Sequence, residues 1–391
     1  MKNWPWILLF HALFLQLAAY IVRPAAAYRA LELGVDPAYL GLIAASFAVV
    51  PLFVAVLVGR ATDAGKEPAV LGIGALLMVA AGVGLILWSS SLGLLLLWNV
   101  ILGLGHLMSV IGQQSRIARG NARQLDTAFG LYTFAGSAGQ AIGPSLIVVF
   151  GGGQVVPNTT ALFAAYTVSC TLMMILTIFL VRRRPGVGPK ATPPPKKLKS
   201  AFLDTTAETR RKLFGAMAVS MMVLAAVDLI AVYLPALGVE RGIPAAAIGI
   251  LLTVRALATM ASRLYLGRLV ARIGRSELIA ASTALSALAV GALAVPMPVV
   301  AMGAVLVVAG IALGIGQPLT MTVISVAAPP GTSGTWLALR LSANRFGQSG
   351  IPAAVGFVAA AAGVAGVFGT TAGALAIVSV ASWFGLRRKP G

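Results

Sequence analysis

The sequence predicts an all-α membrane protein of twelve transmembrane helices, and three observations support this prediction. Hydrophobic residues make up 59% of the 391 residues and charged residues only 10%, which is more apolar surface than a soluble domain can bury. The apolar residues form twelve runs, each close to the roughly 20 residues that an α-helix needs to cross the hydrocarbon core. The segments between the runs are short and carry most of the charge, which leaves little chain for a soluble domain.

Six of the apolar runs precede a polar stretch near the middle of the chain, and six follow it. The N-terminal run ends in small residues, Ala25 to Ala27, as a secretory leader does, but equally apolar runs follow throughout the chain. It is therefore expected to be the first span. The expected spans are Trp6–Ala27, Ala38–Val58, Ala69–Trp88, Leu92–Ile111, Ala128–Phe150, Thr160–Val181, Leu213–Leu237, Ala245–Leu266, Leu278–Val295, Val299–Ala327, Thr335–Ala361 and Val364–Leu386.

Lysine and arginine residues lie almost entirely on one side of the expected spans. Cytoplasmic loops hold these residues preferentially, so both termini are expected in the cytoplasm and the chain in the inner (cytoplasmic) membrane as a multi-pass protein. Only Arg29 and Arg241, each near a glutamate, fall in the opposite loops. The net charge of +19 does not indicate nucleic-acid binding, because the basic residues are not gathered with aromatic residues on a soluble face.

The stretch Arg182–Ser200 is basic and rich in proline, and it predicts a flexible cytoplasmic linker. With the linker taken as 182–212, the chain divides into an N-terminal bundle, 1–181, and a C-terminal bundle, 213–391. The two halves resemble each other at an offset of 208 positions, which indicates a duplicated unit. Parallel six-helix halves place a substrate site between them near the bilayer midplane. The matching pairs are Gly34 with Gly242, Gly41 with Gly249, Gly59 with Gly267, Gly139 with Gly347, Gln140 with Gln348 and Pro144 with Pro352.

Similar basic motifs follow the second and the eighth expected spans. GRATDAGK, which starts at Gly59, and GRLVARIGR, which starts at Gly267, resemble the loop motif G-x-x-x-D-R-x-G-R of the major facilitator superfamily. The first copy is one residue short and lacks the arginine after Asp63, and the second has Ala271 in place of the aspartate. A glycine there is expected to let two helices approach closely. The resemblance implies that Asp63 acts in a conformational latch, paired with an arginine at the end of span 4. The expected latch residues are Gly59, Asp63, Lys66, Arg116, Arg119, Gly267, Arg272 and Arg275.

Two further motifs of the superfamily are matched in part. In span 4, Asn99 replaces the arginine of the pattern R-x-x-x-G-x-G that is associated with proton transfer in relatives, so Asn99 is expected to serve helix packing. In span 5, GSAGQAIGP resembles the glycine-proline motif found mostly in exporters, without its trailing glycine pair. Small residues permit tight helix crossing, and a proline bends the helix. The expected packing residues are Gly103, Gly105, Gly139, Gly143 and Pro144.

Ionisable residues inside the expected spans are costly to bury and are the first candidates for function. Asp228 is the only carboxylate well inside a span. Spans 1 and 7 face each other in this architecture, so Arg23 and Asp228 can pair as an outer gate, and Asp228 is also the natural proton carrier. The excess of arginine indicates that Arg345 and Arg255 recognise an anionic group. The alternative is that one arginine pairs with Asp228 and the others bond backbone carbonyls or snorkel.

Further polar side chains on the expected spans are candidates to line the substrate cavity. One of them, a histidine of span 4, can also shuttle protons or hydrogen-bond a neighbouring helix. These candidates are Gln16, Tyr20, His106, Gln113, Tyr132, Gln140, Gln317, Arg340, Asn344 and Gln348.

The sequence thus predicts a monomeric secondary transporter in the lipid bilayer that exports a small organic molecule, anionic or amphipathic, in exchange for protons. Uptake of an organic anion by symport is the first alternative, and a non-transporting receptor is the second. An enzyme is not expected, because the chain has no P-loop, no His-Glu-x-x-His motif and only two histidines, His11 and His106. Cys170 is the only cysteine, which excludes an intramolecular disulfide and a Cys-based metal cluster. Neither a cofactor nor a metal is therefore expected.

Overall fold

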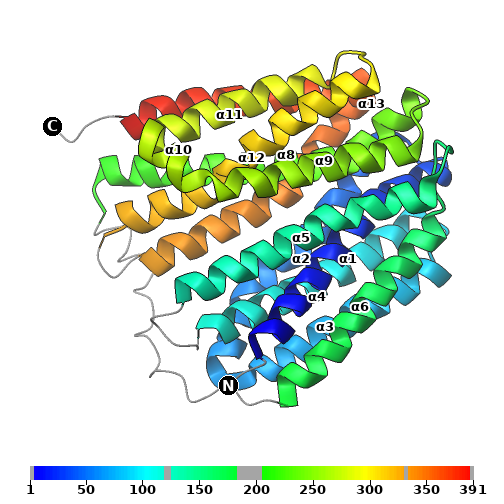
Figure 1. Cartoon of the computed structure of the whole chain (residues 1–391), viewed down its shortest axis with the longest axis horizontal. Coiled ribbons are helices and arrows are strands. Elements are labelled where there is room, and N and C mark those ends of the chain that lie inside the picture. Colours follow the sequence, from blue (N-terminus) through cyan, green and yellow to red (C-terminus); the bar gives the residue numbers. More distant parts are fainter. Residues whose placement is uncertain (1–3, 119–124, 183–204, 330–332, 388–391) are drawn as a thin grey trace.

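The computed structural model describes residues 4–118, 125–182, 205–329 and 333–387, and helices make up nearly all of them (Figure 1). The first half contains α1 (Trp4–Glu32), α2 (Leu40–Ala61), α3 (Glu67–Leu87), α4 (Leu92–Ala118), α5 (Leu125–Gly151) and α6 (Thr159–Arg182). The second half contains α8 (Ala207–Glu240), α9 (Ala245–Leu264), α10 (Leu266–Ile273), α11 (Arg275–Ala292), α12 (Val299–Ala327) and α13 (Ser333–Arg387). Two short helices, η1 (Pro37–Tyr39) and η2 (Thr62–Lys66), flank α2.

Twelve spans can be counted in the described part of the chain. Ten helices are long and apolar enough to cross a membrane, and α10 with α11, which meet at a bend of 112°, add an eleventh. Non-helical backbone at Gly363 divides α13 into two spans, which gives the twelfth. The predicted all-α fold of twelve spans is therefore confirmed.

Several helices continue beyond the ends of the expected spans, into segments that contain charged residues. α1 continues beyond Ala27 to Glu32, and the segment from Gly267 that was expected to be a loop forms most of α10. α8 begins at Ala207, so residues 207–212 of the expected linker are helical; residues 183–204 lie outside the described part. The apolar signal of a span stops at the membrane boundary, so it does not detect helix turns that continue beyond it.

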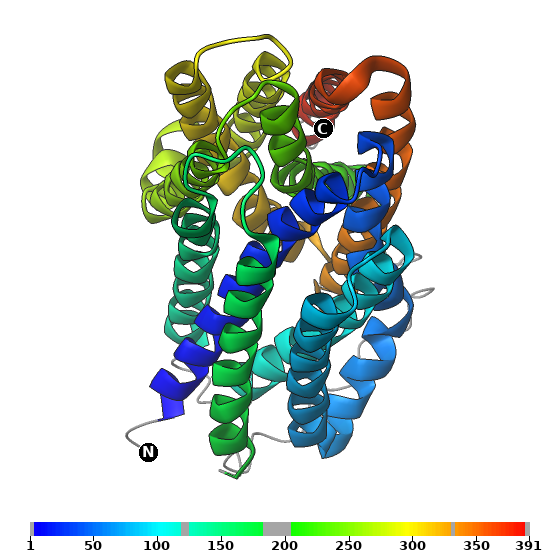
Figure 2. The ribbon, with the colours of Figure 1, turned by 90° about the vertical axis from the view of Figure 1, so that its right-hand side faces the viewer.

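Helices α1–α6 form one bundle and α8–α13 the other (Figure 1). Because each span crosses once, the start of α1, the ends of α6 and α13 and the start of α8 lie at the same end of the molecule, here called the terminal end. The ribbons of the two bundles diverge toward this end (Figure 1). At the opposite, distal end, which faces the viewer in Figure 2, α2 packs against α13 and α5 against α9.

Two of the pairs that repeat between the halves, Gly41 with Gly249 and Pro144 with Pro352, lie where the bundles meet. A Cβ atom on Gly41 in α2 would lie 2.0 Å from the backbone oxygen of Pro352 in α13. A Cβ atom on Gly249 in α9 would lie 3.0 Å from the backbone oxygen of Pro144 in α5. The two contacts are equivalent under the offset of 208 residues, so the duplication extends to the way the halves contact each other.

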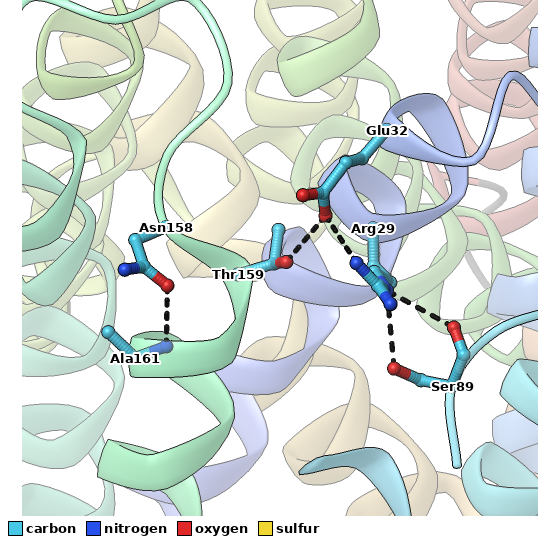
Figure 3. A network of polar contacts seen from close by, with 6 residues as sticks. All are labelled: Arg29, Glu32, Ser89, Asn158, Thr159 and Ala161. Carbon is cyan, nitrogen blue, oxygen red and sulfur yellow. Dashed lines mark hydrogen bonds and ion pairs between the residues drawn. The ribbon is translucent and has the colours of Figure 1, made fainter. Parts of the chain in front are cut away.

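A polar network connects three helices at the distal end of the N-terminal bundle (Figure 3). The Nη1 atom of Arg29 pairs with Oε2 of Glu32 at 2.8 Å, and its Nε donates to the backbone oxygen and hydroxyl of Ser89 at 3.1 and 3.2 Å. The hydroxyl of Thr159 donates to the same Glu32 oxygen at 2.7 Å. These bonds join the end of α1 to the turn after α3 and to the start of α6.

The C-terminal bundle has a similar connection at its distal end. Arg241, which follows α8, donates to the backbone oxygens of residues 293–295 after α11 at 3.1–3.3 Å. Arg29 and Arg241 thus each connect the first helix of a bundle to the end of its third span. The turns beside them contain the equivalent glycines Gly34 and Gly242, with φ angles of 73° and 64° that glycine adopts without strain. Each bundle is therefore held together by its own bonds, which suits movement of the bundles as units.

Candidate functional site between the bundles

An ion pair connects the two bundles in their distal half. Arg23 on α1 donates to the carboxylate of Asp228 on α8, and the two side chains are 12% and 7% exposed. The other oxygen of Asp228 accepts a hydrogen bond from Nε2 of Gln348 on α13 at 2.7 Å. The Oε1 atom of Gln348 accepts a hydrogen bond from Nη1 of Arg345 at 3.0 Å. A chain of polar contacts therefore runs from α1 through α8 to α13 and places one carboxylate between two guanidinium groups.

The guanidinium of Arg23 also faces two aromatic rings. Its carbon lies 4.6 Å from the ring centre of Phe47 and 5.3 Å from that of Tyr20, distances typical of cation–π contacts. Pro24, which follows Arg23 inside α1, has no N–H to donate to the backbone oxygen of Tyr20. A small pocket with room for about one water molecule lies beside the pair. It is lined by Arg23, Ile43, Ala44, Phe47, Asn99, Asp228 and Val232.

His106 is a buried polar side chain without a hydrogen-bond partner. It is 7% exposed, and neither of its ring nitrogens has a partner among the described residues. Its ring packs against Phe47 with the ring centres 5.3 Å apart. Since Phe47 also faces Arg23, the unpaired imidazole lies close to the ion pair that joins the bundles.

A second polar region lies where α5 of one bundle packs against α9 of the other. The Nη1 atom of Arg263 donates to the hydroxyl of Ser137 at 2.9 Å. Gln140, one turn beyond Ser137, donates to Gln16 on α1 at 3.4 Å. Arg255, also on α9, is 2% exposed. Arg263 was missed in the sequence because it lies next to Leu264, the last residue of α9, where an arginine normally marks the membrane boundary.

Three of the expected cavity residues, Gln317, Arg340 and Asn344, lie instead in a network inside the C-terminal bundle. Oδ1 of Asn344 accepts a hydrogen bond from the hydroxyl of Ser220 at 2.9 Å. Nε2 of Gln317 donates to the backbone oxygen of Ser220 at 2.7 Å, and Arg340 donates to the side chain of Gln317. The head groups of Asn344 and Arg340 are thus bonded within α8, α12 and α13.

Tyr132 belongs to a similar network inside the N-terminal bundle. Its hydroxyl donates to Oε1 of Gln113 at 3.0 Å, and Nε2 of Gln113 contacts Nδ1 of His11 at 2.5 Å. The Nε2 atom of the fully buried His11 lies 2.8 Å from the hydroxyl of Thr177, which donates to the backbone oxygen of Met173. These contacts are consistent with a neutral His11 that carries its proton on Nε2. The sequence pointed to Tyr132 and Gln113 as cavity residues, but not to their contacts with each other and with His11.

Four of the expected packing glycines lie at close helix crossings. A Cβ atom added to any of them would meet a neighbouring helix at or below van der Waals contact, so only glycine fits there. Asn99 supports one of these crossings, because its Nδ2 donates to the backbone oxygen of Ile43 at 2.5 Å. The contacts are Gly103 with the backbone oxygen of Phe47 (1.9 Å), Gly105 with that of Gly74 (2.8 Å), Gly139 with that of Leu13 (2.3 Å) and Gly143 with Cβ of Tyr20 (2.9 Å).

The expected reason for the two latch glycines is wrong in this structure. Among the described residues, no atom of another helix lies within 4 Å of a Cβ atom built on Gly59 or on Gly267, so neither glycine marks a close approach of helices there. Gly59 lies near the end of α2 and Gly267 near the start of α10. Lys66, Arg272 and Arg275 are exposed at the terminal end.

The arginine of the expected latch has a carboxylate partner that the sequence did not indicate. Nε of Arg116 lies 3.0 Å from Oε1 of Glu67, and the Glu67 side chain is fully buried. Arg116 also donates to the backbone oxygen of Leu180. The side chain of Asp63 and the whole of Arg119 lie outside the described part of the chain. Glu67 starts α3 directly after the motif, so the pair connects α3, α4 and α6 at the terminal end.

Within the described residues, no group of three or more His, Cys, Asp and Glu side chains is placed to hold a metal ion. The chemistry that these residues offer is ion pairing and hydrogen bonding. Some of these contacts lie within one bundle, and the Arg23–Asp228 pair and the Arg263–Ser137 bond join the two bundles.

Comparison with known proteins shows which family and which solved structures this chain resembles. The sequence profile described as Major Facilitator Superfamily matches residues 8–237 and 213–391. A solved POT family transporter in complex with a thioalcohol-conjugated peptide is 13% identical, with a TM-score of 0.76 over 96% of this chain and 94% of its own. The nucleoside transporter NupG is 14% identical (TM-score 0.75; 99% and 100% covered). A bacterial homolog of the human lysosomal transporter Spinster, in an inward-facing and unoccupied conformation, is 15% identical (TM-score 0.76; 99% and 98% covered). No curated protein sequence matches the chain.

Proposed function

The chain belongs to the major facilitator superfamily, and we propose that it is a secondary transporter that moves a small organic anion across the membrane by alternating access. The similar structures of POT, NupG and Spinster proteins are those of transporters. Their identity to this chain is low, so the substrate class has to be argued from this chain's own residues.

The charge between the bundles is the observation that carries the proposal. Arg23 and Arg263 bond to the other bundle, Arg345 belongs to the chain of polar contacts, and Arg255 is buried on α9. Asp228 is the one carboxylate of the described residues that pairs with any of them. Burying a guanidinium without a counter-charge is costly. An anionic substrate supplies that charge, and a carboxylate or phosphate matches the guanidinium fork in shape.

The Arg23–Asp228 pair has the position of a gate at the distal end. It joins α1 to α8 beside the glycine–proline contacts that pack the bundles together there. Opening the distal end requires these bundles to separate, which breaks the pair. The described basic residues lie mainly at the terminal end, and this asymmetry supports a cytoplasmic location for that end in an inner membrane. The structure would then be closed toward the outside.

Coupling to protons follows from the same pair, and its sign depends on the substrate. Protonation of Asp228 releases Arg23, and a substrate anion near Arg23 competes with the Asp228 carboxylate. An anion and a proton therefore promote each other's binding, by linkage, and are carried in the same direction. Symport of an organic anion with protons is thus the coupling that the charges favour.

Export in exchange for protons is the second candidate, and the glycine-proline motif of α5 is the observation that favours it. Antiport requires a cargo that competes with the proton for Asp228, as a cationic or amphipathic molecule does. The direction of the proton current therefore separates the two candidates.

The Arg116–Glu67 pair and the basic motifs at the terminal end belong, in this proposal, to the latch of the opposite gate, with Asp63 as a further member.

The test uses protein reconstituted in liposomes that contain a pH-sensitive dye. The substrates are hydroxy acids such as gluconate, whose neutral forms cross lipid slowly, and lipophilic cations. Acidification of the interior with an external hydroxy acid, reduced about tenfold or more in Arg345→Gln, supports anion symport. Arg182→Gln, at an exposed arginine at the end of α6, is the matched control. Proton movement with the cations alone would support the exporter, and ligand binding without any flux would indicate a receptor.

A further inference from the structure

Two arginines of α9 have no carboxylate partner among the described residues, and the Nε atom of each is buried. Arg255 is 2% exposed, and the Nε atoms of Arg255 and Arg263 have no hydrogen-bond partner among the described residues. The ion pairs of the described residues join other side chains. They are Arg23 with Asp228, Arg29 with Glu32, Arg116 with Glu67 and Lys212 with Glu208.

The groups that surround these two arginines are neutral or already engaged. Arg263 donates from Nη1 to the hydroxyl of Ser137. The carboxylate of Asp228 is bonded to Arg23 and to Gln348. Hydroxyl and amide groups can accept a hydrogen bond from a guanidinium but cannot neutralise its charge. The region between α5 and α9 therefore has positive charge, free donors and no acid of its own.

This region is distinct from the polar chain that ends at Arg345. Arg345 lies on α13 and bonds Gln348, whereas Arg263 lies on α9 and bonds Ser137 on α5. An anion bound to Arg345 alone would leave the charges of Arg255 and Arg263 on α9 uncompensated. An anion bound on α9 alone would leave the charge of Arg345 uncompensated. Two acidic groups on one molecule compensate both.

We propose that Arg263, with Arg255 and Ser137, forms a second anion subsite, and that the substrate carries two acidic groups. One group binds at the Arg345 end and the other between α5 and α9. The inference rests on the proposed function and defines its substrate class as a small dicarboxylate or phosphocarboxylate. Because Arg263 and Ser137 belong to different bundles, a group bound between them contacts both halves of the transporter.

Matched aldonic and aldaric acids provide the test, because each pair has the same carbon skeleton with one or two carboxylates. Gluconate and glucarate are the six-carbon pair, and pairs of four and five carbons test the spacing. Dissociation constants are measured by calorimetry on detergent-solubilised full-length protein, and uptake is measured in liposomes. The wild type is expected to bind one of the aldaric acids at least about tenfold more tightly than its aldonic partner, the size of one added charged hydrogen bond.

Arg263→Gln is expected to remove this preference and leave aldonic-acid binding within about twofold. Arg263→Lys, which keeps the charge, should retain part of it, and Ser137→Ala should weaken it slightly. Arg345→Gln should weaken the binding of both acids, and Arg182→Gln, at an exposed arginine, should weaken neither. The thermal midpoint of each variant without ligand shows whether it is folded.

Three results would overturn the subsite. They are equal affinity of the wild type for both members of every pair, an equal loss for both acids in Arg263→Gln, and no effect of that variant on either. In the first case, transport of aldonic acids leaves the proposed function in place. If the wild type binds and transports neither class of acid, the proposed anion transport fails together with the subsite.

Discussion

Replacement of Asp228 by asparagine tests whether the Arg23–Asp228 pair holds the distal end closed. The change keeps the size of the side chain and one oxygen acceptor but removes the negative charge. Both side chains are mostly buried, at 12% and 7% exposure, so the charged hydrogen bond is worth about 1.5–3 kcal/mol, more than an exposed one. The bond from Gln348 at 2.7 Å also weakens, because its acceptor becomes neutral.

This energy sets the expected shift in the population. A difference of about 1.4 kcal/mol is a factor of ten in an equilibrium constant. The fraction of molecules open at the distal end should therefore rise about 10- to 150-fold, as long as the open state is the minor one. Arg23→Gln should have a similar effect. The double variant should have little more than either single one, because all three remove the same pair.

A cysteine in place of Ala245 reports the opening. Ala245 is fully buried at the start of α9, where its N–H donates to the backbone oxygen of Gln154 in the other bundle at 2.7 Å. The only native cysteine, Cys170, is also fully buried. The rate of labelling by a membrane-impermeant maleimide therefore measures exposure of position 245. Glu32→Gln is the control, since it removes a distal carboxylate from a network within one bundle. Equal labelling rates with and without Asp228→Asn would refute the role of the pair as a gate.

Three further predictions concern the packing of the bundles and the burial of charge. Gly41→Ala should raise the labelling rate at position 245 more than Gly249→Ala does. The added Cβ would lie 2.0 Å from a backbone oxygen of the other bundle at position 41 but 3.0 Å at position 249. Equal labelling rates for the two variants would contradict the packing argument. Gly103→Ala, whose Cβ would meet Phe47 within one bundle, should lower the thermal midpoint without raising labelling, and increased labelling would count against this assignment. Glu67→Gln should destabilise the fold by about 3–5 kcal/mol through loss of a buried pair. Glu208→Gln breaks the more exposed pair with Lys212 and should lower the free energy of unfolding by under about 1 kcal/mol. Similar thermal midpoints for Glu67→Gln and Glu208→Gln would show that burial of the Glu67 pair does not matter.

The fold could be predicted from the sequence because lipid imposes one simple requirement. Every span must be apolar and about 20 residues long, so twelve runs and one polar stretch define two bundles. The offset of 208 residues also pointed to Gly41 and Pro352, although not to their contact. Repeated small residues mark positions where close packing is required in both halves, and such positions are visible without knowledge of the partner.

The site could be predicted only in part, because a charged residue in a sequence does not identify its partner. Asp228 and Arg23 stood out, since ionisable groups deep in a span are rare. Arg263 and Glu67 did not, because each lies at a span end, where charge is common. Asn344 and Arg340 have the same sequence features as Arg345, and only the fold separates those bonded within one bundle from those near the interface.

The two halves share their packing but not their charges, and this difference is where function has to lie. The position equivalent to Asp228, 208 residues earlier, is Tyr20, and that of Arg255 is Phe47. Tyr20 and Phe47 provide the aromatic faces around Arg23, to which Asp228 supplies the charge. The equivalent of Arg345 is Ser137, the partner of Arg263. A symmetric scaffold allows either end to open, and the asymmetric charges decide what has to be bound when it does.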